Sequence, residues 1–82
     1  MANVDFVKVD AADNNITING AMFTLYKADE SWTKGKEVER VTSKNGGTFG
    51  FEKLLPGNYL LNETKAATGY SLVTDPWKIV IK

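Results

Sequence analysis

Short segments rich in β-branched and aromatic residues recur along the chain, separated by clusters of Gly, Asn, Asp and Pro. This pattern is typical of β-strands joined by turns, and no long window keeps a helical period. We therefore predict an all-β fold with strands at Val4–Asp10, Ala21–Lys27, Glu37–Thr42, Thr48–Glu52, Asn58–Thr64 and Trp77–Lys82.

Alternation within these segments gives each predicted strand one apolar face. The predicted core residues are Ala21, Phe23, Leu25, Phe49, Phe51, Trp77, Ile79 and Ile81. Strands of this length with one apolar face each favour a small antiparallel β-sandwich. At 82 residues, the chain is long enough for one domain, which we assign to residues 1–82.

The composition excludes several functions. The chain has no Cys and no His, so disulfides, thiolate zinc sites and the usual Ser-His or Cys-His nucleophiles are absent, and we expect no metal and no cofactor. Ten basic and ten acidic residues give a net charge of zero, so we do not expect nucleic acid as a partner. The opening MANVDFVKVD lacks an apolar segment, and we expect neither a signal peptide nor membrane insertion. We interpret the chain as an excised domain whose targeting signals lie outside it.

Two charged residues fall on apolar faces of predicted strands. Glu63 shares a face with Tyr59 and Leu61, and Lys8 shares one with Phe6. Burying either charge alone is costly, so we predict that Lys8 and Glu63 lie on the core side of adjacent strands and contact each other.

Two interpretations of this pair remain open at this point. The first is structural, with a buried ion pair or two side chains that reach the rim of the sandwich. The second is chemical, because removal from water favours the neutral form of both groups. A proton that passes from lysine to glutamate leaves a neutral amine, which is a nucleophile for an Asn or Asp carbonyl.

Four blocks of the sequence resemble Cna B-type domains, which are SpaA-like domains of prealbumin-like fold. The blocks are FVKVDA, GAMFTLYKAD, GTFGFEKLLPGNYLLNETKAATGY and DPWKIVIK. The resemblance implies an immunoglobulin-like or prealbumin-like sandwich of about six to seven strands. It also implies a stalk or spacer module of a Gram-positive pilin or adhesin. Such a module is extracellular, anchored to the cell wall as part of a larger protein, and lies between neighbouring stalk domains.

The resemblance further implies an autocatalytic isopeptide bond between a lysine of the first strand and an Asn or Asp of the last. It assigns Lys8 as the nucleophile and Glu63 as the proton carrier in a single-turnover reaction, not in a true enzyme. Two positions depart from the family pattern. Ala67 replaces a common proline, and no Asn or Asp follows Asp75.

Three interpretations of the missing acceptor follow. The acceptor strand lies outside this chain and comes from a separate peptide or neighbouring chain, as in one half of a split ligation pair. Alternatively, the domain forms no crosslink, and Lys8 and Glu63 make only a salt bridge. The third is an unusual acceptor within the chain, for which Asp75 is the weak candidate. A module that binds a host protein through its loops and sheet edge, without a crosslink, is the alternative function.

Overall fold

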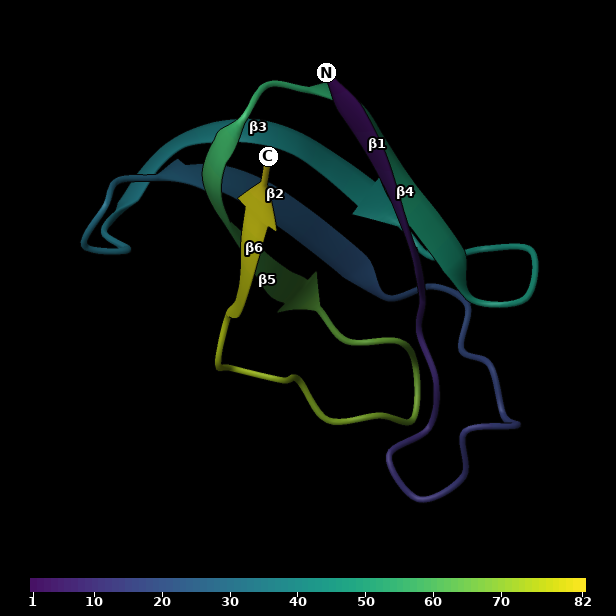
Figure 1. Ribbon diagram of the computed structural model, residues 1–82. Helices are drawn as coiled ribbons and strands as arrows, with labels where there is room; N and C mark the ends of the chain where they lie inside the picture. The colour runs from purple at the N-terminus through teal and green to yellow at the C-terminus, as the bar shows by residue number, and fades with distance from the viewer.

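A computed structural model describes all residues from 1 to 82. It contains six strands and no helix (Figure 1). The strands are β1 (Ala2–Val7), β2 (Met22–Ala28), β3 (Lys34–Thr42), β4 (Thr48–Leu54), β5 (Gly57–Lys65) and β6 (Trp77–Ile81). Each overlaps one strand predicted from the sequence, so the all-β fold class is confirmed. No helix is present that could span a membrane.

The strands form two antiparallel sheets. One is a pair of β1 and β4, and the other has the order β3-β2-β5-β6. Figure 1 shows β1 alongside β4, with the other four strands forming a separate curved layer. In this topology β1 and β6 are both edge strands, because each pairs with only one neighbour.

The apolar faces of the two sheets enclose the core. Its largest fully buried residues include Phe23 and Leu25 from β2 and Phe51 from β4. Phe6 and Phe49 pack against this cluster and stack on each other with ring centroids 5.2 Å apart. The alternation in the sequence places these side chains inward, as expected for a strand with one face on the core.

The outer strand β3 is exposed along nearly its whole length and rich in charge. On it, the Arg40 guanidinium donates two hydrogen bonds to Glu37, at 3.0 and 3.1 Å. These bonds raise the pKa of Arg40 above its ordinary value. Charged side chains on an edge strand discourage pairing with another strand, so this side of the larger sheet is protected.

Candidate functional site

Lys8 directly follows β1 and continues its pairing with the chain before β4. Its backbone N–H donates to the carbonyl of Gly47 at 2.8 Å, and its carbonyl accepts from the N–H of Ile18 at 2.9 Å. Side chains alternate along a strand, so Lys8 lies on the same face as Val4 and Phe6. Its side chain is therefore directed into the sandwich and is only 19% exposed.

Glu63 lies near the end of β5 and enters the core from the other sheet. It follows Tyr59 and Leu61 on the inward face, and its side chain is 1% exposed. One carboxylate oxygen, Oε2, accepts a hydrogen bond from the backbone N–H of Val73 at 3.2 Å. This bond attaches the connection between β5 and β6 to the buried carboxylate.

The second oxygen of Glu63 faces Lys8. The distance from Lys8 Nζ to Glu63 Oε1 is 3.3 Å, which is an ion-pair contact. Oε1 has no well-directed hydrogen bond from any protein group. It therefore retains capacity to accept a proton from the ammonium group beside it.

The predicted contact between Lys8 and Glu63 is present, but the prediction that they lie on adjacent strands is wrong. Lys8 extends from β1, which pairs only with β4, whereas Glu63 belongs to β5, which pairs with β2 and β6. The two side chains meet across the interior of the sandwich. Side-chain alternation identifies the inward face of a strand, but it does not identify the strand that lies opposite.

The free edge of β1 presents unpaired backbone groups next to Lys8. The N–H of Lys8 points to the β4 side, and successive residues of a strand point to opposite edges, so Val7 and Val9 point away from β4. None of the backbone hydrogen bonds in loops and turns involves Val7 or Val9. These groups are available to an added strand.

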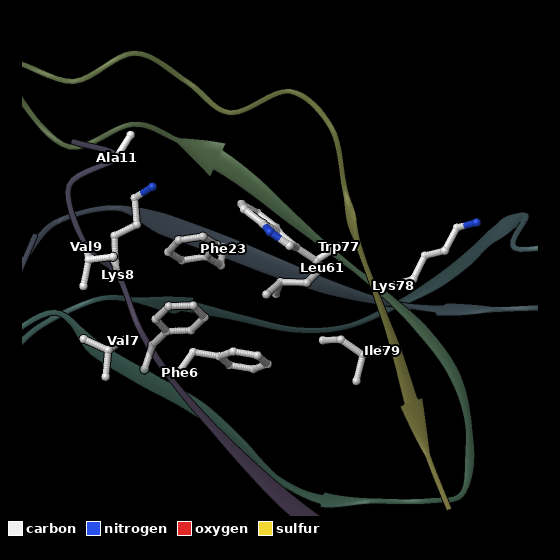
Figure 2. Close-up of a pocket in the computed structure, with 11 residues that line it drawn as sticks. Phe6, Val7, Lys8, Val9, Ala11, Phe23, Leu61, Trp77, Lys78 and Ile79 are labelled. Atoms are coloured by element: carbon white, nitrogen blue, oxygen red, sulfur yellow. The ribbon is translucent and has the colours of Figure 1, made fainter. Parts of the chain in front are cut away.

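An apolar groove separates this free edge from β6. Its volume is about 460 Å³, and nine of its 11 lining residues are hydrophobic. Figure 2 shows Phe6 and Lys8 on one side of the groove and Trp77 and Ile79 on the other. The groove thus lies between one unpaired edge of each sheet, and Lys8 is among the residues that line it.

Stacked aromatic rings form the floor of the groove. Phe23 lies against Phe49 with centroids 4.1 Å apart, and Trp77 lies 6.1 Å from Phe23. With the Phe6–Phe49 stack, these rings form a column that runs from β1 to β6. Such a floor offers apolar contact area to the side chains of any strand that enters.

The prediction that Trp77 is a core residue is wrong, because the residue is 41% exposed. Of its predicted partners, Ile81 is buried and Ile79 is partly buried against the core. The cause is the position of β6 at the edge of its sheet, where the groove leaves one side of the indole uncovered.

The weak acceptor candidate Asp75 lies outside the groove. It is exposed in the connection before β6, and it does not line the groove that contains Lys8.

Sequence reasoning missed the Val73 contact with Glu63, because a backbone donor leaves no signal in residue type. No group of three or more potential metal-ligating side chains gathers in the structure.

Two small antiparallel sheets that enclose a core and an ion pair define this protein as an immunoglobulin-like β-sandwich. A family model described as SpaA, prealbumin-like fold domain, matches residues 2–82. The chain belongs to this family, and the resemblance noted from the sequence is confirmed.

Solved structures give the same assignment. A structure of the Bacillus anthracis TIE protein is 35% identical, with a TM-score of 0.83 over 98% of this chain and 14% of that chain. Two structures of BcpA, the major pilin subunit of Bacillus cereus, are 27% identical, with TM-scores of 0.73. They match 98% of this chain and 26% or 25% of theirs, so the chain spans about a quarter or less of these relatives. No curated protein sequence gave a significant match.

Proposed function

We propose that this chain is a structural stalk module of an extracellular, wall-anchored pilin or adhesin of Gram-positive type. In this proposal the groove accepts an extended strand, and Lys8 forms an isopeptide bond with an Asn or Asp of that strand. The observation that carries the proposal is the Lys8–Glu63 contact of 3.3 Å beside a groove with unpaired strand edges. The pilin relatives support the stalk role and association with neighbouring domains.

The chemistry requires only groups that are close together. The Lys8 ammonium gives a proton to Glu63 Oε1, and the neutral amine attacks the side-chain carbonyl carbon of Asn or Asp. A C–N bond forms to Lys8. The bond to the departing Asn nitrogen or Asp oxygen breaks. That atom takes the proton held by Glu63 and the second proton that the amine loses on amide formation, so it leaves as ammonium from Asn or as water from an ionised Asp. Glu63 returns to its ionised form, so the reaction consumes no other reagent and each domain reacts once.

The groove favours an extended strand over a compact ligand. The free groups of Val7 and Val9 are spaced for ladder hydrogen bonds, and the aromatic floor contacts alternate side chains. A strand in this position directs every second residue inward, so an Asn or Asp between apolar residues brings its carbonyl to Lys8. Binding then supplies the proximity that makes amide formation feasible.

Such a bond would suit a stalk, because a covalent link between two strands transmits pulling force without extension of the fold. The alternative function is a module that binds a host protein through its loops and sheet edge, without a crosslink. We favour the crosslinking module, because the Lys8–Glu63 contact lies beside the groove.

The test is intact-mass measurement after incubation with a synthetic peptide of about nine residues, which is strand length. The peptide alternates Val or Ile with Thr and carries one central Asn or Asp. We expect a one-to-one adduct whose mass is below the sum of the reactants by about 17 Da for Asn or about 18 Da for Asp.

Two variants separate binding from chemistry. Glu63→Gln keeps the side-chain shape but removes the proton carrier, so the peptide should bind without an adduct. Lys8→Ala should also give no adduct. Peptide binding with no adduct in the wild-type chain would support the crosslink-free spacer, and absence of both would contradict the groove assignment.

A further inference from the structure

A ring of hydrogen bonds holds the backbone of Lys8 in place. Its N–H donates to the Gly47 carbonyl at 2.8 Å, and its carbonyl accepts from the Ile18 N–H at 2.9 Å. The ring closes through Asn19, because the Gly47 N–H donates to Asn19 Oδ1 at 2.7 Å. Ile18 and Asn19 are neighbours in sequence, so this one segment hydrogen-bonds to both Lys8 and Gly47.

Gly47 fits into this ring only because it lacks a side chain. It is buried and has φ of 79°, in the region that favours glycine. A Cβ atom at this position would lie 2.6 Å from the Lys8 carbonyl oxygen and 3.0 Å from the Ile18 nitrogen. The backbone at Gly47 therefore packs directly against the backbone of Lys8 and Ile18, with no room for a side chain.

Asn19 supplies the side chain that completes this contact. Its Oδ1 accepts the hydrogen bond from the Gly47 N–H, which donates to no backbone carbonyl. Without that acceptor, a donor in a buried residue would be left unpaired, which favours movement of the chain around Gly47. Movement of Gly47 would shift the Lys8 backbone that hydrogen-bonds to it.

We propose that Asn19 is a positioning residue for Lys8, acting through Gly47 to hold the amine against Glu63. This inference rests on the proposed crosslinking function. Asn19 does not touch the reacting atoms. Its role is to fix the point from which the Lys8 side chain extends, so that Nζ stays beside Glu63 Oε1 and faces the groove.

The experiment compares three variants. Asn19→Ala removes the acceptor, whereas Asn19→Asp keeps an oxygen at the same position. Asn3→Ala is the matched control, because Asn3 Oδ1 also accepts one backbone N–H, that of Lys53 at 2.9 Å, near the opposite end of β1. A general loss of strand pairing would affect both alanine variants, whereas a positioning effect would be confined to position 19.

The first readout is amide hydrogen exchange by NMR, which does not depend on any crosslink. We expect the Lys8 and Gly47 amides to exchange about fivefold or more faster in Asn19→Ala, as for loss of one hydrogen bond. They should stay within about twofold of wild type in Asn19→Asp and Asn3→Ala. Unchanged exchange in Asn19→Ala would overturn the positioning proposal, whether or not the chain forms adducts.

The second readout is the rate of adduct formation with the Asp-containing peptide at saturating concentration. The affinity for the same peptide is measured separately in chains that also carry Glu63→Gln, which should bind the peptide without forming the adduct. We expect Asn19→Ala to slow adduct formation about tenfold while affinity changes less than about threefold, and Asn19→Asp to restore the rate. Equal losses of rate and affinity would contradict positioning. If the wild-type chain forms no adduct, the crosslinking function fails, and hydrogen exchange alone decides whether Asn19 holds Lys8.

Discussion

The amine of Lys8 lies 3.3 Å from a carboxylate oxygen of Glu63, although the two residues come from different sheets. Their contact therefore links the sheets across the core and is not part of the pairing within either one. Because Glu63 is almost fully buried and Lys8 is not, the two partners should respond unequally to substitution.

Substitution of this pair should reveal that inequality in the free energy of unfolding. Lys8→Met keeps the apolar stem but leaves a buried carboxylate with only the Val73 N–H, so we expect a loss of about 2–4 kcal/mol. Glu63→Gln leaves an ammonium that still reaches water, and the expected loss is about 1 kcal/mol. Urea unfolding measures both.

The double variant serves as the control for coupling. Lys8→Met with Glu63→Gln should lose less stability than the sum of the single losses, because no unpaired charge remains. Strictly additive losses would show that the two residues do not interact in solution.

Gly47→Ala should be among the most destabilising single-methyl changes in this chain. The new methyl group would collide with backbone atoms of Lys8 and Ile18, and the positive φ adds strain, so we expect a loss of about 3 kcal/mol. Gly46→Ala is the matched control. Gly46 also has a positive φ, but nothing lies within 4 Å of its Cβ position, so the cost should be about 1 kcal/mol. Thermal unfolding that gives equal shifts would argue against a close approach at Gly47.

Val7→Pro should impair strand binding with little effect on folding. The Val7 N–H points to the free edge of β1, so proline removes a donor that the folded domain does not use. We expect peptide affinity to fall about tenfold or more, while the free energy of unfolding changes by less than about 1 kcal/mol. Val7→Ala keeps the N–H and should retain most of the affinity, and calorimetric titration compares the two. A similar loss in both variants would indicate that the Val7 side chain, not the edge, binds the peptide.

Trp77 should report occupation of the groove. It is 41% exposed and lines the groove, so a bound strand should bury the indole and shift its fluorescence to shorter wavelength. The Trp32→Phe variant leaves Trp77 as the only tryptophan, since the chain has two. An unchanged emission maximum at saturating peptide would place the bound strand elsewhere.

The elements of this fold could be predicted from the sequence because they depend on local alternation. The segment Asn58–Thr64, for example, corresponds to β5 at Gly57–Lys65, and the inward face with Tyr59, Leu61 and Glu63 is as expected. These features depend only on which residues share a face and where turn residues interrupt the pattern.

Relations between distant segments could not be predicted in the same way. The sequence indicated that Lys8 and Glu63 meet, because two inward charges need each other, but not that they meet across the sandwich. The exposure of Trp77 depends on which strands form the sheet edges, and this is a property of topology. The contacts of Val73 and Gly47 are made by backbone groups, which every residue type except proline carries in the same form.

The two sheet edges that flank the groove also determine how many strands the groove can accept. The edge of β1 and the edge of β6 line the same groove, whereas the remaining outer strand of the larger sheet, β3, is covered with charge. The groove therefore has a valency of one for strand addition. One donated strand fills the groove, and the charged edge of β3 disfavours a second addition, so strand addition here does not extend the larger sheet from molecule to molecule.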